Sequence, residues 1–192
     1  MSNVSFEKEI RDFLRNQDIS YKDYTNSATK VDFSYTLKSH TFWFDVKEKR
    51  QEYNMKNWTD LIPEKDCFIL DELGIRKVME HGAYSGIIIR NNLLDEYIFF
   101  SFLDLFSMPK IRVNRETNSK GYLKGKWIIN LNNGKRCKTL KELFLSIGKY
   151  KEKKDNLFSQ GECYGEYSGE KIEIKGTTRT GYYKFIDYSS TR

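Results

Sequence analysis

Residues that build disulfide frameworks and zinc sites are scarce in this chain. Its 192 residues include three cysteines, two histidines and two prolines. The cysteines Cys67, Cys137 and Cys163 are odd in number and widely spaced, which excludes a disulfide framework and a zinc-finger pattern. Two histidines do not suffice for a histidine-rich zinc centre. We therefore expect a protein of a reducing compartment, the cytoplasm.

Long apolar runs are also missing. No run reaches the length of about 18 residues that a transmembrane helix requires, so we expect no membrane partner. Residues 1–7 lack the apolar stretch of a signal peptide. Hydrophobic residues nevertheless make up 39% of the chain and aromatic residues 15%, which favours a globular protein over a disordered one.

Charge is distributed unevenly along the chain, whose net charge is +6. Residues 1–109 contain 14 Lys and Arg against 18 Asp and Glu, whereas residues 110–155 contain 14 against 4. Such a basic segment is either a solvated charged face or a surface for a polyanion. The aromatic residues within it suit base stacking or, equally, the core of an appended domain.

Hydrophobic periodicity predicts an α/β fold. We expect helices over 5–16 and 68–81 and strands over 31–35, 42–47, 84–90 and 96–102, which form a first unit ending near Pro109. A strand over 126–131, a helix over 139–147 and short strands within 161–188 should follow. The predicted organisation is a core of residues 1–109 and a basic α+β extension of residues 110–192.

Three charged residues in the first two predicted strands should converge. Side chains alternate between the faces of a strand, so Asp45 and Lys47 share one face. If the two strands form a hairpin that turns at residues 38–39, position i pairs with position 77 − i, and Asp32 faces Asp45 with Cβ atoms about 4.5–5.5 Å apart. Residues 38–39 are not a preferred turn, so a longer loop with a shifted register is the alternative.

Two facing carboxylates repel one another unless a cation lies between them. Mg²⁺ binds a few carboxylates together with water and phosphate oxygens, and it activates water and neutralises charge on a phosphate. Lys47 would orient or deprotonate the attacking water, or stabilise the pentacovalent phosphate. The competing interpretation is a plain ion pair between Asp32 and Lys47 on an exposed sheet face.

The order of these motifs resembles the PD-(D/E)xK nuclease superfamily, and within it the archaeal Holliday junction resolvases, over residues 1–105. In that branch the first helix carries a Glu followed by an apolar residue, which matches FEKEI at residues 6–10. Glu7 is the counterpart, and Glu9 is the alternative. An apolar-flanked Asp follows, here KVDF at residues 30–33, and then an acidic-x-Lys motif, here DVKEK at residues 45–49.

The resemblance implies a restriction-endonuclease-like core, with a central mixed sheet flanked by helices. It implies an endonuclease that hydrolyses phosphodiester bonds in DNA with Mg²⁺, for which Mn²⁺ substitutes, and without a small-molecule cofactor. The implied catalytic residues are Glu7, Asp32, Asp45 and Lys47. Of these, Glu7, Asp32 and Asp45 would be the metal ligands.

The chain departs from the family pattern in ways that bear on the substrate. Val31 stands where the family has Pro, and Asp45 where Glu is more usual. The stretch after Lys49 is longer than in the resolvases, and residues 110–192 lie outside the resemblance. Three functions therefore stay open: a junction resolvase, a restriction-type or defence endonuclease acting on a duplex target, and a non-catalytic nucleic-acid-binding protein.

Contacts with DNA are expected from cations near the predicted site and from the basic segment, because phosphates position the substrate on either side of a cut. The candidates near the site are Lys30, Lys49 and Arg50, and those in the basic segment are Lys124, Lys126, Lys135, Arg136 and Lys138. Cutting both strands of a duplex or junction needs two sites related by symmetry, so we also expect a homodimer.

Overall fold

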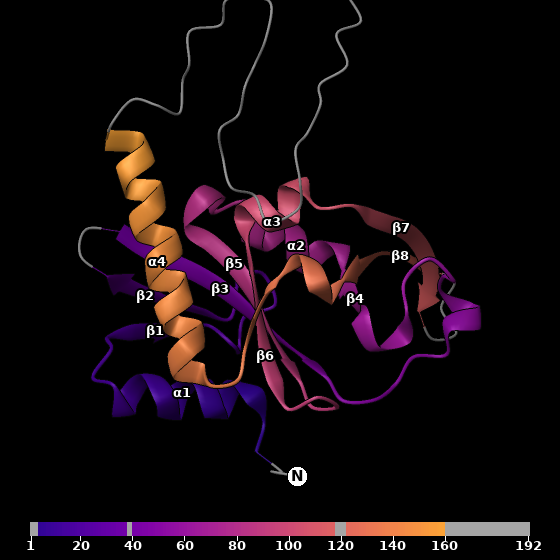
Figure 1. The fold of residues 1–192 in the computed structure, drawn as a ribbon, viewed down its shortest axis with the longest axis horizontal. Coiled ribbons are helices and arrows are strands. Elements are labelled where there is room, and N and C mark those ends of the chain that lie inside the picture. Colours follow the sequence, from indigo (N-terminus) through magenta and orange to yellow (C-terminus); the bar gives the residue numbers. More distant parts are fainter. Residues whose placement is uncertain (1–3, 38–39, 118–121, 160–192) are drawn as a thin grey trace, which may run out of the picture.

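The structure is a computed structural model that describes residues 4–37, 40–117 and 122–159 (Figure 1). The turn at residues 38–39 and the strands expected within 161–188 lie outside the described residues. Within the described part, no helix combines the length and the apolar character needed to cross a membrane.

A mixed sheet forms the centre of the fold, which confirms the predicted α/β class. Its strands β3 and β5 are parallel, and all other neighbours are antiparallel. The order across the sheet is β1 (Tyr21–Asp23), β2 (Phe33–Leu37), β3 (His40–Lys49), β5 (Ser85–Asn91), β6 (Glu96–Ser101) and β9 (Lys135–Cys137).

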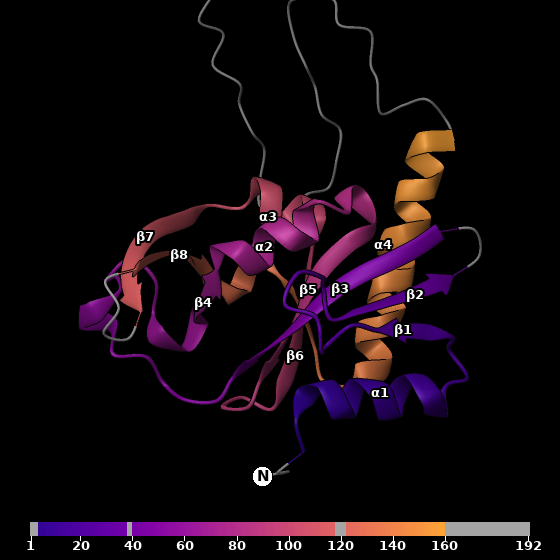
Figure 2. The ribbon, with the colours of Figure 1, turned by 180° about the vertical axis from the view of Figure 1, so that it is seen from behind.

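Helices cover both faces of this sheet (Figures 1 and 2). The helices α1 (Phe6–Asn16) and α4 (Leu140–Ser159) pack on one face around a core rich in phenylalanine. The helices α2 (Glu72–Met79) and α3 (Phe102–Ser107) pack on the other face, around isoleucines of β5 and β6. The faces of the sheet therefore have different neighbours, which decides the surroundings of each charged side chain on β3.

Helix α1 confirms the predicted first helix and its cap. The Ser5 side chain accepts a hydrogen bond from the Lys8 backbone N–H at 3.3 Å, which satisfies one of the free donors of the first turn. Phe6, Ile10 and Leu14 recur on one face of the helix and are fully buried. Each burial contributes about 1.5–3 kcal/mol relative to exposure, so this stripe fixes α1 to the sheet.

The β2–β3 hairpin has the predicted register, since Phe33 pairs with Phe44. Residue 32 directly precedes β2, so Asp32 lies at the end of this ladder, next to Asp45. Phe44 and Val46 are buried on the α1 side. Alternation along β3 therefore turns Asp45 toward the α2 side.

A second, three-stranded sheet corrects the prediction of a helix over 68–81. Residues Cys67–Asp71 form the strand β4, which pairs with β8 (Tyr122–Asn130), and β8 pairs with β7 (Lys110–Thr117). The helix begins only at Glu72. Cys67, Phe68 and Leu70 are buried, and so short an apolar run fits a strand or a helix equally well by periodicity.

The fold also does not divide at residue 109. The strand β4, from the predicted core, shares a sheet with β7 and β8 from the predicted extension. The strand β9 completes the edge of the central sheet beside β6, and α4 packs on that sheet. Residues 110–159 are therefore an integral part of the fold, because they supply strands to both sheets and a helix to the core.

Candidate active site

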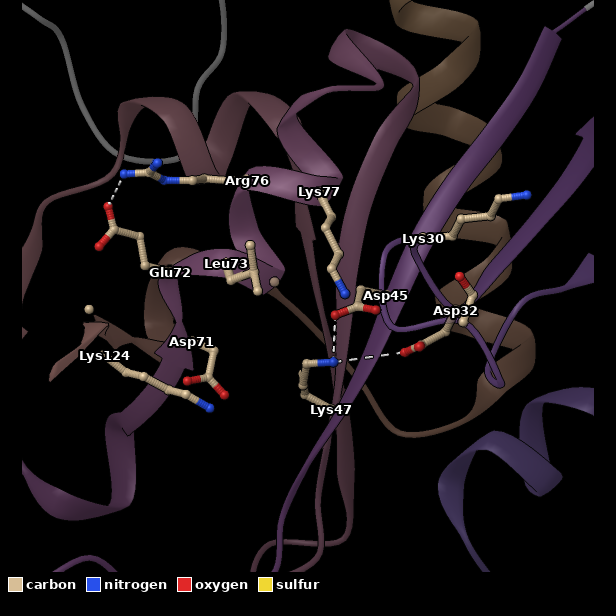
Figure 3. Close-up of a pocket in the computed structure, with 13 residues that line it drawn as sticks. Lys30, Asp32, Asp45, Lys47, Asp71, Glu72, Leu73, Arg76, Lys77 and Lys124 are labelled. Atoms are coloured by element: carbon tan, nitrogen blue, oxygen red, sulfur yellow. Dashed lines mark hydrogen bonds and ion pairs between the residues drawn. The ribbon is translucent and has the colours of Figure 1, made fainter. Parts of the chain in front are cut away.

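A cleft with a volume of about 410 Å³ lies between β3, α2 and β8 (Figure 3). Its floor carries Asp32, Asp45 and Lys47, three of the four predicted catalytic residues. Other cleft-lining residues come from the first two turns of α2 and from Lys124 and Gly125 of β8. The structure thus brings the β2–β3 motif together with β8, which the resemblance did not cover, and with α2, whose start the periodicity misassigned.

Asp45 and Lys47 form the centre of the site. The Asp45 side chain is only 5% exposed, and its Oδ2 lies 2.5 Å from Lys47 Nζ. Asp32 Oδ2 lies 3.8 Å from the same ammonium and accepts a hydrogen bond from the Val46 backbone N–H at 2.9 Å. This hydrogen bond orients the Asp32 carboxylate toward Asp45.

The oxygens around Lys47 Nζ suit a small hard cation. The ammonium also donates to the Val46 backbone carbonyl at 3.1 Å, so two carboxylates and one carbonyl converge on one positive charge. Carboxylate and carbonyl oxygens are the protein ligands that divalent cations such as Mg²⁺ take. The described residues contain no group of three or more acidic, histidine or cysteine side chains placed for a metal. Two carboxylates would therefore leave most coordination positions to water and substrate, as Mg²⁺ prefers.

The site holds more negative charge than its lysine neutralises. Burial, and then the neighbouring Asp45 carboxylate, raise the pKa of Asp32 to about 7. Burial acts against the charge of Lys47, but Asp45 and Asp32 outweigh it and raise the pKa of that ammonium. Asp32 therefore binds a proton around neutral pH, and a metal ion in the cleft would be stabilised by replacing that proton and leaving both carboxylates ionised.

Helix α2 closes over the site through a glycine. A Cβ atom on Gly74 would lie 3.6 Å from Asp45 Oδ2 and 4.0 Å from Lys47 Cε, so a longer side chain there would enter the cation position. The helix is fixed by Glu72, whose carboxylate accepts from Arg76 at 2.7 Å and from Arg112 of β7 at 2.9 Å.

Gly125 of β8 provides the space that the Glu72 side chain occupies. A Cβ atom at Gly125 would lie 1.9 Å from Glu72 Oε2, so a larger residue there would displace the Glu72 carboxylate from this position. Periodicity gave no signal for these α2 contacts because it extended the helix over β4.

Glu7 lies apart from the other three predicted catalytic residues. It belongs to the first turn of α1, which covers the opposite face of the sheet from Asp45, and it is not among the residues that line the cleft. Glu9, the alternative, pairs with Arg90 and accepts a hydrogen bond from the Tyr97 hydroxyl. A metal role for Glu7 stays a prediction, without a contact that supports it.

The cations predicted near the site have three different environments. Lys30 lines the cleft, and its ammonium lies 4.8 Å from the centre of the Tyr24 ring. Arg50 is exposed and pairs with Glu48. Lys49 is 1% exposed, lies 2.9 Å from Glu64 Oε1 and donates to the Glu64 backbone carbonyl at 2.6 Å. The expected phosphate contact of Lys49 is therefore wrong for this structure, because Glu64 holds its ammonium in the interior.

The cations of the basic segment are divided between the cleft and the far edge of the sheet. Lys124 lines the cleft, and Lys126 pairs with Asp71. Arg136 lies on β9, where it pairs with Glu96 and Asp66. These carboxylates give Arg136 a structural role, and its phosphate contact stays a prediction. Lys135 and Lys138 belong to the same edge and do not line the cleft.

Among the solved structures, 14 chains are similar to this one, and two of them illustrate the likeness. One is Hjc of Archaeoglobus fulgidus, a Holliday junction resolvase from an archaeal hyperthermophile, with 12% identity over 65% of this chain and 80% of that chain and a TM-score of 0.39. The other is D212, a nuclease from a fusselovirus, with 11% identity over 76% of this chain and 87% of that chain and a TM-score of 0.43. No protein-family profile matches the chain, and no curated protein sequence matches it.

Proposed function

We propose that this protein is a metal-dependent nuclease that hydrolyses phosphodiester bonds in DNA. One observation carries the proposal: the carboxylates of Asp32 and Asp45 and the Val46 carbonyl converge on a single cation position at the floor of an open cleft. Cations that line the cleft, such as Lys30 and Lys124, suit a polyanionic substrate.

Asp32, Asp45 and the Val46 carbonyl would hold Mg²⁺, for which Mn²⁺ substitutes, and the Lys47 ammonium that contacts these oxygens would turn toward the phosphate. The bound ion would supply activation of water and neutralisation of phosphate charge. Asp45 is held rigid by burial, and Asp32 by its hydrogen bond from Val46 N–H. Both carboxylates therefore keep their positions without a substrate, which favours catalysis by preorganised charge.

Lys47 acts in this proposal as a charge stabiliser. Hydrolysis joins a water oxygen to phosphorus and breaks one ester bond, so negative charge grows on the phosphate oxygens. The Lys47 ammonium lies beside both carboxylates as a cation, which favours this role over that of a base. A fixed cation beside the scissile phosphate then lowers the free energy of the transition state.

The competing function is a nucleic-acid-binding protein in which Lys47 only pairs with the two aspartates. The charge balance of the site speaks against it. Two carboxylates share one ammonium, and the pKa of Asp32 is raised to about 7. A purely structural pair would be more stable with one carboxylate fewer, because the second carboxylate adds repulsion that the shared ammonium does not cancel.

The test is a cleavage assay on supercoiled plasmid, linear duplex and a four-way junction, in Mg²⁺, Mn²⁺, Ca²⁺ or chelator. We expect cutting in Mg²⁺ and Mn²⁺, and binding without cutting in Ca²⁺, whose looser coordination misplaces the water. Asp45→Asn and Asp32→Asn should each cut at less than about 1% of the wild-type rate while folding and binding DNA normally. Substantial cutting by either folded variant, or by the wild type in chelator, contradicts the proposal.

The substrate that we propose first is a branched duplex of the Holliday junction type, and the second is a duplex target of a restriction-type or defence enzyme. Preferential cutting of the four-way junction over linear duplex favours the first, and cutting at one sequence favours the second. We further propose a homodimer, because symmetric cuts in two strands need two sites. Light scattering on the purified protein measures that state directly.

A further inference from the structure

The second sheet has an inner face, toward α2, and an opposite outer face, which is cationic at its end around residues 115 and 124–126. Phe68, Leu70 and Ile129 point to the core around α2. Directly paired residues of an antiparallel sheet share a face. Lys126 pairs with Asp71 and with Val113, so this row lies on the face opposite Leu70 and Ile129. Lys124, two residues before Lys126, therefore lies on the outer face.

Arg115 of β7 extends this outer face away from the cleft. It pairs directly with Lys124, and both side chains are exposed. The strand order β4, β8, β7 places Asp71 nearest the core of the site, Lys124 next and Arg115 outermost. Cations thus continue from the cleft wall across the sheet.

Trp58 fixes the outermost cation. The Arg115 guanidinium carbon lies 4.8 Å from the centre of the Trp58 ring, in the segment between β3 and β4. Stacking on an aromatic ring orders a guanidinium without consuming its hydrogen-bond donors. The stretch after Lys49, which is longer than in the resolvases, and the residues from 110 onward, which lie outside the resemblance, therefore meet at this surface.

The charges on this face leave two cations available to a ligand. Asp71 is taken up by Lys126. Within the described ranges, no ion pair joins a carboxylate to Lys124 or Arg115. Figure 3 shows Lys124 and Lys30 on opposite sides of Asp45 and Lys47. A strand whose phosphate lies at Lys47 would therefore meet a cation on each side.

We infer that the outer face of the second sheet, with Lys124, Arg115 and Trp58, docks the sugar–phosphate backbone of the DNA flank that leaves the cleft past β8, on the side away from Lys30. The inference rests on the proposed function and names a binding surface for the same substrate. Lys30 would hold the opposite flank with a single cation. The flank that passes β8 would then be held more strongly than the flank at Lys30, through contacts independent of base sequence.

The experiment measures binding rather than cutting. The probe is a fluorescent duplex of random sequence, titrated with the full-length Asp45→Asn protein in Ca²⁺ over a range of salt concentrations. Adding Arg115→Ala and Lys124→Ala should flatten the slope of log affinity against log salt by about 1.8, because each lost phosphate contact contributes about 0.9. Affinity at low salt should fall about tenfold or more.

Two controls make the result specific. Lys141→Ala with Lys149→Ala removes the same charge from exposed positions of α4, on the other side of the central sheet, and should leave the slope unchanged. Arg115→Lys with Lys124→Arg keeps both charges and should keep most of the slope. Equal slopes for the Arg115/Lys124 and Lys141/Lys149 alanine variants would overturn the inference.

The outcome separates this inference from the proposed function. If the wild type cuts DNA but the Arg115/Lys124 alanine variant binds as tightly and with the same slope, the docking surface is wrong and the nuclease stands. If no metal supports cutting but the slope falls as expected, the nuclease is wrong and the surface binds nucleic acid without it.

Discussion

Both faces of β3 carry charged clusters, and the clusters differ in their balance. On the α2 side, Asp45 and Asp32 share the single ammonium of Lys47 in an open cleft. The carboxylates outnumber their cations, and burial together with Asp45 raises the pKa of Asp32 to about 7. This cluster is incomplete without a further positive charge.

On the α1 side the carboxylates are fully matched. Glu48 of β3 and Glu9 of α1 both pair with Arg90 of β5, and Arg50 gives Glu48 a second cation. Burial opposes the charge of Glu48, yet hydrogen bonds from Arg50 and Arg90 outweigh it and lower its pKa. The Tyr97 hydroxyl donates to Glu9 as well.

The contrast shows how neighbouring positions of one strand take different roles. A balanced cluster ties a helix to the sheet, as Arg90 ties α1 to β3 and β5. In an unbalanced cluster the carboxylates repel one another until a further cation binds between them. Such destabilising arrangements are typical of functional sites. The predictions below separate the two faces by what each loses on substitution.

The largest effect is expected at Lys47. Lys47→Met should lower the cleavage rate by about 10²–10³-fold, the usual loss for one transition-state charge stabiliser. Glu48→Gln, the next residue but on the α1 face, should leave the rate per folded molecule unchanged. Single-turnover cleavage of plasmid, with folding checked by circular dichroism, measures both. Equal losses in the two variants would remove the distinction between the faces.

Breaking the balanced cluster should lower stability and not the cleavage rate. Arg90→Met leaves the largely buried Glu48 and Glu9 without their shared cation, and we expect the free energy of unfolding to fall by about 3 kcal/mol. Arg50 is 68% exposed, so Arg50→Met in the same cluster should change it by less than about 1 kcal/mol. Urea denaturation measures both values. If Arg50→Met lowered the free energy of unfolding as much as Arg90→Met, the exposure of an ion pair would not decide its contribution to stability.

In the unbalanced cluster, removing a charge should raise the free energy of unfolding instead of lowering it. The pKa of Asp32 is raised from its ordinary value of 3.8 to about 7 in the folded protein. The folded state therefore binds the extra proton between these values, and the wild type loses stability as pH rises from about 4 to about 7. Asp32→Asn removes this loss while the amide oxygen can still accept from Val46 N–H.

The Asp32→Asn variant should thus match the wild type near pH 4 and exceed its free energy of unfolding above about pH 7, by about 1–3 kcal/mol in chelator. Urea denaturation across this pH range, without divalent metal, measures the difference. A variant less stable than the wild type at high pH would show that the carboxylate stabilises the fold. Addition of Mg²⁺ should narrow the gap, because the metal stabilises only the wild type.

The geometry of β2 and β3 could be predicted because alternation on both strands fixes one register. Phe33 and Phe44 can share the core only if the hairpin pairs as it does, and this places Asp32 beside Asp45. The sequence placed Lys49 near the site, but alternation along a strand does not show what covers a side chain. Glu64, on a turn fifteen positions later, buries that lysine.

The rest of the site depends on contacts between distant segments. The strand β4 is a strand because β8 lies beside it, and Arg136 is structural because Asp66 and Glu96 reach it. Gly125 gains its role only from Glu72. None of these pairings leaves a periodic signal in the chain, so sequence patterns gave the fold class and the motif but not the far wall of the cleft.

The smallest effect is expected at Glu7, which the family resemblance placed among the catalytic residues. Helix α1 covers the face of β3 opposite Asp45, and Glu7 does not line the cleft. Glu7→Gln should therefore reduce cleavage by less than about threefold, well under 1 kcal/mol of transition-state stabilisation. The assay is the single-turnover measurement used for Lys47, with Asp45→Asn as the reference for a lost metal ligand. A loss as large as that of Asp45→Asn, in a folded variant that still binds DNA, would mean that Glu7 reaches the metal once substrate is bound. The face of the sheet on which a residue lies would then not decide its role, and the α1 cluster would belong to the catalytic site as well as to the fold.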